Sequence, residues 1–256
     1  MSGKNVETYI VLDTETGGLN PIYNPITEVA LAVLHPDTLS EVTRFQTYVF
    51  TDNPIILSEE DFKAISKKPT SKASQEEIDA FNVKIPKNCY KGGYLVQEAI
   101  ESTGISPEKI AKKGKNVETV VNTLIGVFES VKITKSSFSK PILVGHNVMF
   151  DIDMLKYMFS ICKEDLSKYI AGSHSYDGAW HPLVIDTIIE AKKYDSCMNS
   201  YNLRAVAESM NIELVNAHSA MTDVVTTIEV FKKTVFNMRS GEGAKKEARF
   251  RDTFQI

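Results

Sequence analysis

The stretch TYIVLDTETGGLN, residues 8–20, ends a short apolar run with two acids, Asp13 and Glu15, followed by a double glycine. A continuous apolar run of this length predicts a central β-strand that is covered on both faces. Side chains at positions i and i+2 of a strand point to the same side, so both carboxylates are expected on one face. Such a pair resists burial unless a cation lies between the two groups. The stretch therefore predicts either a cation site at the end of the strand or a plain Asx-type turn with an exposed glutamate.

Composition limits the classes of protein that remain. Hydrophobic residues make up 43% of the 256 residues and charged residues 24%, which is ordinary for a soluble globular protein. No apolar run approaches the ~20 residues of a membrane span, and the N-terminal residues lack the apolar core of a secretory signal. The three cysteines are odd in number and far apart, so neither a disulfide framework nor a zinc site is expected. We therefore expect a cytoplasmic protein with no membrane partner.

The order of the expected elements predicts an α/β protein. Strands are expected at residues 9–13, 26–35, 41–50, 141–145 and 182–186, the second and third forming a hairpin, with helices at residues 75–81, 117–131, 187–194, 202–210 and 219–236 and another from Val148. An opening meander followed by alternating strands and helices favours a mixed sheet with helices on both faces. We expect one domain over residues 1–238, with residues 51–95 as an insertion or lid, and a flexible tail over residues 239–256.

A second acid follows the strand at residues 141–145. If the next helix starts near Val148, Asp151 lies on or beside its buried stripe, whereas Asp153 faces solvent. An inward acid in the first turn is favoured by the helix dipole, so its role could be structural. It nevertheless needs a partner, and the strand-to-helix junction places it at the same sheet edge as Asp13 and Glu15.

A third acid, Asp223, begins the last helix, five residues after His218. The buried stripe of this helix is expected to consist of Val224, Ile228, Phe231 and Val235. Asp223 lies at the edge of the stripe and His218 on the approaching loop. A lone histidine there is more often a surface or packed residue, so its importance depends on the other acids.

Taken together, four carboxylates at one edge predict a divalent metal site. Oxygen ligands select Mg²⁺ or Mn²⁺, and two such ions about 3.5–4 Å apart suit in-line displacement at phosphorus. A neutral imidazole with a pKa near ~6.5 would suit His218 as the base that takes a proton from the attacking water.

Three motifs resemble those of the DEDDh, or DnaQ-like, superfamily of 3′–5′ exonucleases, which includes the proofreading subunit of bacterial replicative polymerase, RNase T and oligoribonuclease. They are DTETGG with Asp13 and Glu15, GHNVMFD ending in Asp151, and HSAMTD with His218 and Asp223 in H-x4-D spacing. One such motif is weak, but three in order over residues 8–235 are specific.

The resemblance implies a ribonuclease H-like, mixed five-stranded sheet flanked by helices. It implies Asp13, Glu15, Asp151 and Asp223 as ligands of two Mg²⁺ or Mn²⁺ ions, and His218 as the base. It also implies substrate-binding roles for Thr16, Gly17, Leu19, His146, Asn147 and Phe150. The last of these could equally be plain core.

The implied reaction removes nucleoside 5′-monophosphates from the 3′ end of single-stranded DNA or RNA, with DNA favoured. A DNA polymerase or other replication protein is a candidate partner. Alternatives are an exoribonuclease like RNase T or oligoribonuclease, an endonuclease on the same scaffold, and a non-catalytic module that binds nucleic acid or a polymerase.

Residues 84–94, KIPKNCYKGGY, interleave tyrosine and lysine. We hypothesise that Tyr90 and Tyr94, between Lys87 and Lys91, guide a single strand by stacking and phosphate contact. Acids nearly balance the lysines of residues 51–95, so a solvated mixed-charge face is the plainer interpretation. A similar role for Trp180 is a weaker hypothesis.

Overall fold

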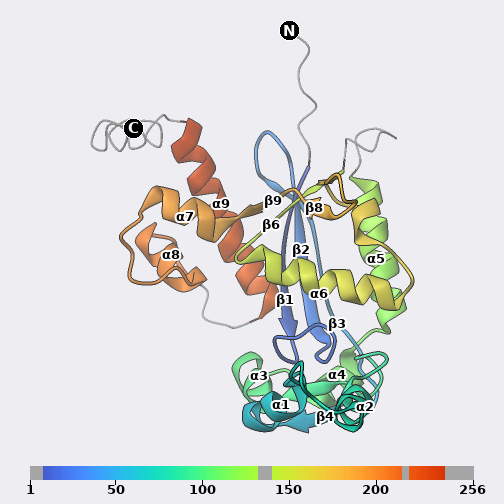
Figure 1. The fold of residues 1–256 in the computed structure, drawn as a ribbon. Helices are drawn as coiled ribbons and strands as arrows, with labels where there is room; N and C mark the ends of the chain where they lie inside the picture. Colours follow the sequence, from blue (N-terminus) through green and yellow to red (C-terminus); the bar gives the residue numbers. More distant parts are fainter. Residues whose placement is uncertain (1–7, 132–139, 215–218, 240–256) are drawn as a thin grey trace.

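A central mixed sheet organises the computed structural model, which describes residues 8–131, 140–214 and 219–239 (Figure 1). Within these residues the sheet has five strands in the order β3-β2-β1-β6-β9. Their bounds are β1 Tyr9–Thr16, β2 Ile26–Leu34, β3 Glu41–Tyr48, β6 Ile142–Gly145 and β9 Val184–Asp186. The apolar run at the start of the chain is thus the central strand, as its composition predicts.

The direction of the strands changes at β1. The strands β1, β2 and β3 pair antiparallel, whereas β1, β6 and β9 pair parallel. The β2–β3 pair confirms the expected hairpin, and the two pairing modes confirm the mixed sheet. Every residue of β2 is buried, because this strand has a neighbour on each side and helices or loops on each face. The edge strand β3 is mostly exposed.

Helices cover both faces of the sheet, as expected. On one face Leu12 and Leu31 pack in a single core cluster with α5 (Val117–Ser130) and α6 (Val148–Ile161). On the opposite face α9 (Ala220–Arg239) packs against a second cluster that includes Ala30. The α9 residues of this cluster are Val224, Ile228 and Phe231, with Val235 packed against them. The predicted buried stripe of the last helix is therefore confirmed.

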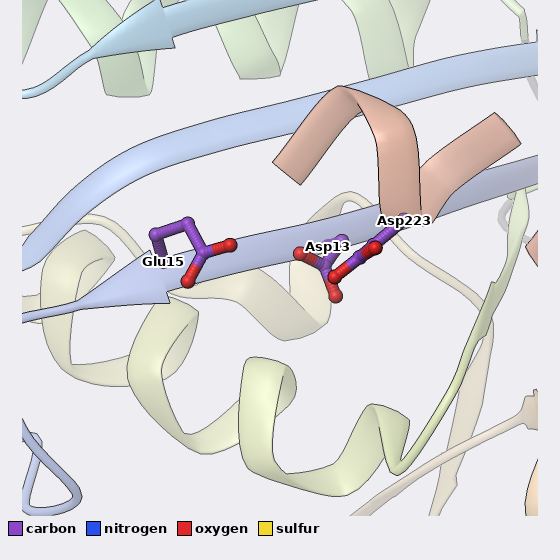
Figure 2. Close-up of side chains that lie close together, drawn as sticks. All are labelled: Asp13, Glu15 and Asp223. Carbon is purple, nitrogen blue, oxygen red and sulfur yellow. The ribbon is translucent and has the colours of Figure 1, made fainter. Parts of the chain in front are cut away.

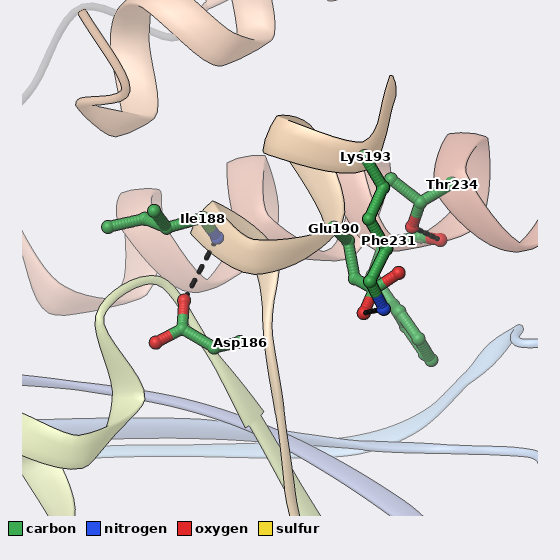
Figure 3. Close-up of polar contacts among 6 residues, drawn as sticks. All are labelled: Asp186, Ile188, Glu190, Lys193, Phe231 and Thr234. Atoms are coloured by element: carbon green, nitrogen blue, oxygen red, sulfur yellow. Dashed lines mark hydrogen bonds and ion pairs between the residues drawn. The ribbon is translucent and has the colours of Figure 1, made fainter. Parts of the chain in front are cut away.

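Two further helices extend the α9 side of the molecule. They are α7 (Thr187–Tyr194) and α8 (Leu203–Ser209), and they share a small core with Val230 of α9. Figure 3 shows the start of α7, where the Oδ1 atom of Asp186 accepts a hydrogen bond of 2.9 Å from the Ile188 N–H. The acid at the carboxyl end of β9 is thus the N-terminal cap of α7.

A small subdomain follows β3 and lies beyond the carboxyl end of β1 (Figure 1). Its elements are β4 Ile55–Leu57, α1 Glu59–Ser66, α2 Gln75–Lys84, β5 Tyr94–Val96, α3 Gln97–Thr103 and α4 Pro107–Lys113, with β4 and β5 paired parallel. A capping box between Ser74 and Glu77 starts α2. This subdomain extends beyond the expected insertion at residues 51–95, because α3 and α4 pack with it. Between α6 and β9 lie a short 3₁₀ helix, Leu166–Lys168, and the hairpin of β7 Gly172–His174 and β8 Trp180–Pro182.

The subdomain is joined to the glycine loop after β1. The Val96 N–H donates to the Gly17 carbonyl at 2.7 Å, and the buried Asn24 amide donates to the Tyr94 carbonyl at 2.9 Å. A Cβ atom at Gly17 would lie 2.4 Å from the Leu95 Cδ2 atom, so a larger residue there would force the buried Leu95 side chain to move. The subdomain therefore supports the loop that follows the first two acids.

The stacking hypothesis for residues 84–94 is wrong for Tyr90. This side chain is 4% exposed, and its hydroxyl accepts a hydrogen bond of 3.1 Å from the Ile26 N–H, so it anchors the segment to β2. Tyr94 packs against Tyr23 and Phe62 instead of forming an open platform. Both aromatic rings are used to attach the subdomain.

Two expectations concern parts of the chain that lie wholly or mostly outside the described residues. The expected flexible tail falls on residues 240–256, apart from its first residue, which ends α9. His218 also falls outside them. Among the helices that are described, none combines the length and the apolar character of a membrane span.

Candidate active site

Three carboxylates meet at the carboxyl end of β1. Asp13, Glu15 and Asp223 each offer one oxygen atom, and these atoms all lie within 4.8 Å of one another (Figure 2). The first two share a face of β1, and the third comes from the first turn of α9, which covers that face. We call these three residues the acidic cluster.

The acidic cluster is unfavourable for three negative charges without a counter-ion. Burial, together with the charges of Asp151, Glu15 and Asp223, raises the pKa of Asp13 well above its usual range. Burial and the charges of Asp223 and Glu28 raise the pKa of Glu15 to about 7. Both shifts have the cause expected when carboxylates crowd together in a partly desolvated place.

Asp151 lies beside the acidic cluster and has partners of its own. It is 4% exposed and lies in the first turn of α6, which begins at Val148 as predicted. Its Oδ1 atom accepts two hydrogen bonds from Thr14, at 2.9 Å from the backbone N–H and 2.7 Å from the hydroxyl. Burial raises the pKa of Asp151 to about 7, and the two bonds from Thr14 oppose that rise.

The short length of β6 explains how Asp151 reaches Thr14. The paired residues of β1 and β6 end at Val11 and Val144, so β6 leaves the edge of β1 open from Leu12 onward. The chain then turns into α6 through Asn147, whose φ of 63° is left-handed. The first turn of α6 thereby fills the open edge, and the Asp151 carboxylate takes the place of a strand partner.

A divalent cation fits this donor set. Converging carboxylate oxygens are the ligands that Mg²⁺ and Mn²⁺ prefer, and a cation would relieve the repulsion that raises the pKa of Asp13 and of Glu15. Asp151 brings a fourth carboxylate close enough to act on the charge of Asp13. The Oδ1 atom of Asp151 already accepts both hydrogen bonds from Thr14, so Oδ2 is the oxygen atom that could bind a cation.

The sequence-predicted substrate residues fall into two groups. Leu19 is 83% exposed and borders a groove of about 490 Å³ together with Phe150, Met154 and Tyr157 of α6. Thr16, in contrast, is buried, and its hydroxyl donates to the Gly18 carbonyl at 2.7 Å within the loop. Leu19 and Phe150 thus stand where a ligand could touch them, whereas the Thr16 side chain shapes the loop.

His146 and Asn147 hold neighbouring elements together at the end of β6. The two ring nitrogens of His146 lie 2.9 Å from the Thr187 hydroxyl and 2.8 Å from the Tyr201 carbonyl oxygen. The backbone N–H of Asn147 donates to the Oδ1 atom of Asp186 at 3.1 Å, and its side chain is exposed. The His146 ring is therefore engaged with α7 and the segment before α8, while the Asn147 side chain is available to a ligand.

Three residues that shape this site were not among the candidates expected from the sequence. They are Thr14, which binds Asp151, Asp186, which caps α7 and binds the Asn147 N–H, and Glu28, which lies on β2 opposite Glu15. Glu28 carries a signal that could have been used, because it is a single acid inside the apolar strand ITEVALAVL. Thr14 carries none, since its importance depends on a residue 137 positions away.

One family model matches more than half of the chain. The profile of the exonuclease family (RNase_T) matches residues 76–231, which contain Asp151 and Asp223 but begin after β1. A PolC-type DNA polymerase III from Thermotoga petrophila is 24% identical over 232 residues, which are 91% of this chain and 12% of the polymerase. The chain thus spans about an eighth of that relative.

Solved structures of Escherichia coli exonuclease I are similar in fold. The complex with a dT13 oligonucleotide has a TM-score of 0.58 at 17% identity, covering 92% of this chain and 42% of exonuclease I. A zinc-bound complex of the same enzyme with single-stranded DNA has a TM-score of 0.58 at 18% identity, covering 93% and 42%. The likeness supports the ribonuclease H-like sheet that the motifs imply.

The family profile covers more than half of the chain, and the three acidic motifs occur in the expected order. This chain belongs to the exonuclease family, in its DEDDh or DnaQ-like branch.

Proposed function

We propose that this protein is a metal-dependent 3′–5′ exonuclease that removes nucleoside 5′-monophosphates from the 3′ end of single-stranded nucleic acid, with DNA the favoured substrate. The observation that carries the proposal is the acidic cluster, whose oxygen atoms lie within 4.8 Å of one another. Three crowded carboxylates of this kind suit a cation that binds a phosphate group.

Four acids would hold two Mg²⁺ or Mn²⁺ ions. Asp13, Glu15 and Asp223 would share one ion, and Asp13 and Asp151 would share the other. Bound ions of this kind activate a water molecule and neutralise charge that develops on the scissile phosphate and the leaving 3′ oxygen. Thr14 would keep the Asp151 carboxylate in position through its two hydrogen bonds.

His218 is our candidate for the general base. In the sequence it lies five residues before Asp223. A neutral imidazole would accept the proton of the attacking water, and proton transfer by a positioned side chain typically contributes about 10²–10⁴-fold to the rate.

The groove beside α6 supports a single-stranded substrate. Leu19 and Phe150, which border it, are close in sequence to the acids Glu15 and Asp151. Exposed apolar side chains can stack on unpaired bases. The Nζ atom of Lys156, which lines the groove on α6, lies 5.3 Å from the centre of the Trp180 ring on β8, so a cation and an aromatic ring lie together beside this helix.

The relatives support DNA as the favoured polymer. The similar exonuclease I structures contain single-stranded DNA, and the curated relative is a DNA polymerase. We therefore also propose that the protein acts beside DNA synthesis, through a polymerase or another replication protein. An exoribonuclease and a non-catalytic binding module are the alternatives that the experiment must separate.

A time course on labelled oligonucleotides tests the proposal. Single-stranded DNA and RNA of several lengths, a blunt duplex and a circular single strand would be incubated with Mg²⁺, with Mn²⁺ or with EDTA. We expect 5′-labelled linear DNA to shorten stepwise, 3′-labelled DNA to release a labelled mononucleotide at once, and EDTA to stop both reactions. The duplex should be degraded more slowly, because its terminal bases must first unpair.

Each alternative predicts another pattern. Faster loss of RNA would reassign the substrate, cutting of the circular strand would indicate an endonuclease, and binding without hydrolysis under any metal would indicate a non-catalytic module. The matched control is Asp13→Ala, which removes a proposed ligand from the acidic cluster.

A further inference from the structure

Glu28 is a buried carboxylate that belongs to none of the three motifs. It lies on β2 directly across from Glu15 in the antiparallel ladder, and it is 1% exposed. Directly paired residues of neighbouring strands place their side chains on the same face of a sheet. Glu28 therefore lies on the face that carries the acidic cluster and that α9 covers.

The two oxygen atoms of Glu28 join three elements. The Oε2 atom accepts a hydrogen bond of 3.2 Å from the backbone N–H of Ala220, the first residue of α9. The Oε1 atom accepts one of 2.8 Å from the Nε2 atom of Gln46 on β3. The carboxylate is thus held by the neighbouring strand and in turn holds the start of the helix.

The bond to Ala220 fixes the turn that carries Asp223. The first N–H groups of a helix have no partner inside the helix, so a carboxylate that accepts one of them stabilises that end. The Asp223 N–H in turn donates to the Ser219 carbonyl at 3.1 Å, which ties it into the same first turn. A shift of this turn would move Asp223 relative to the two acids on β1.

Glu28 also acts through its charge. Among the described residues, its donors are neutral groups, a backbone N–H and a side-chain amide, which satisfy its oxygen atoms without adding a positive charge. Because Glu28 is the direct partner of Glu15 in the ladder, its negative charge acts on the same place as the charges of the acidic cluster. The same field that disfavours further anions attracts a divalent cation.

We propose that Glu28 is a positioning residue of the metal site, which places Asp223 through the N-terminus of α9 and strengthens cation binding by its charge. This inference depends on the proposed metal site and goes beyond its ligands. Residues that orient ligands in this way are worth about 10–100-fold in metal affinity in known metalloproteins.

Two variants separate the charge from the position. Glu28→Gln keeps the length of the side chain and an oxygen atom that accepts from the Ala220 N–H. Its amide N–H can donate to the Gln46 side-chain oxygen after the Gln46 amide flips. Only the charge is therefore lost. Glu28→Asp keeps the charge but withdraws the carboxylate by one methylene from the Ala220 N–H. The control Glu41→Gln removes a charge from the exposed strand β3, where Glu41 pairs with Arg44.

Calorimetric titration with Mn²⁺ alone is the measurement, so no turnover is required. We expect Glu28→Gln to weaken Mn²⁺ binding about 10-fold, Glu28→Asp to weaken it by a smaller factor, and Glu41→Gln to bind as the unaltered protein does. A purely structural role predicts instead a lower Tm in EDTA and unchanged affinity. Circular dichroism and Tm establish that each variant is folded.

The outcomes distinguish this inference from the proposed function. If the unaltered protein binds no Mn²⁺, the metal site itself is wrong. If it binds Mn²⁺ and Asp13→Asn does not, the site stands, and unaltered affinity in folded Glu28→Gln overturns the role of the charge. Unaltered affinity in folded Glu28→Asp overturns the role of the position.

Discussion

The carboxylates on the two sides of the end of β1 have different surroundings. On the side that α9 covers, Asp13, Glu15 and Asp223 crowd together, and the pKa of Asp13 and that of Glu15 are raised. On the side where α6 fills the open edge, burial also raises the pKa of Asp151 to about 7, but Thr14 donates two hydrogen bonds to this carboxylate and opposes the rise.

The difference shows what each side requires. Asp151 has donors within the protein, so its position is fixed whether or not a cation is bound. A cation would offset the repulsion that raises the pKa of Asp13 and of Glu15 in the acidic cluster. We therefore expect the Asp151 side to be formed in advance and the acidic cluster to be completed by an ion.

The largest effect is expected from alanine at an acid on either side. Asp13→Ala and Asp151→Ala should each lower kcat by on the order of 10³-fold, since each removes a proposed ligand. Their stabilities should differ. Asp151→Ala leaves two buried donors of Thr14 unpaired and should cost about 1–3 kcal/mol, whereas Asp13→Ala removes repulsion and should keep or raise Tm in EDTA.

Oligonucleotide hydrolysis and thermal unfolding of both variants check this comparison. Retained turnover in Asp13→Ala would remove that residue from the site. Equal losses of Tm in the two variants would contradict the contrast between a pre-built side and a cation-completed side.

A smaller effect is expected from the Thr14 hydroxyl. Thr14→Val keeps the branched shape and the backbone N–H but loses the 2.7 Å bond to the Asp151 Oδ1 atom. A hydrogen bond to a charged group contributes about 1.5–3 kcal/mol, so kcat should fall about 10-fold or more at unchanged KM. Thr14→Ser should restore most of it, and Thr43→Val on exposed β3 is the control. If Thr14→Val keeps full kcat, the backbone bond alone positions Asp151.

The smallest effect concerns stability against pH without metal. The pKa of Glu15 is raised from 4.5 to about 7, so the folded protein holds this proton over a range in which the unfolded chain has lost it. Stability from this group is therefore full below about pH 4.5 and is lost as pH rises through about 7. In EDTA, the Tm of the unaltered protein should fall as pH rises over this range. The Tm of Glu15→Gln should fall less steeply.

Mg²⁺ should offset this loss of Tm at higher pH. A cation competes with the proton for the same oxygen atoms, so the rise in Tm caused by Mg²⁺ should grow with pH. Scanning fluorimetry from pH 5 to 8, with EDTA and with Mg²⁺, measures both slopes. A Tm in EDTA that is equally dependent on pH in Glu15→Gln would exclude Glu15 as the cause.

Local patterns were enough to predict the sheet and its main helices. The apolar run before Asp13 is the central strand, residues 26–35 and 41–50 form the hairpin, and the last helix has its expected buried stripe. These features follow from the spacing of apolar residues along the chain, which is a property of neighbouring positions.

The small subdomain was harder to predict. Its strands β4 and β5 have three residues each and pair across nearly forty positions, so neither shows a pattern of its own. Tyr90 looked like an exposed aromatic between lysines, but it is buried because its hydroxyl meets the Ile26 N–H. That contact depends on how the segment folds back onto β2.

By itself the sequence determined the family, the three acidic motifs, and the strand and helices that carry the four acids, which are β1, α6 and α9. Short-range spacing of residues encodes these features. Only the tertiary structure decided that three carboxylates crowd together while Asp151 is held by Thr14, and that Glu28 joins β2 to the helix of Asp223. The physical reason is distance along the chain: these contacts join residues 137 and 192 positions apart, and only the packing of the whole sheet brings them together.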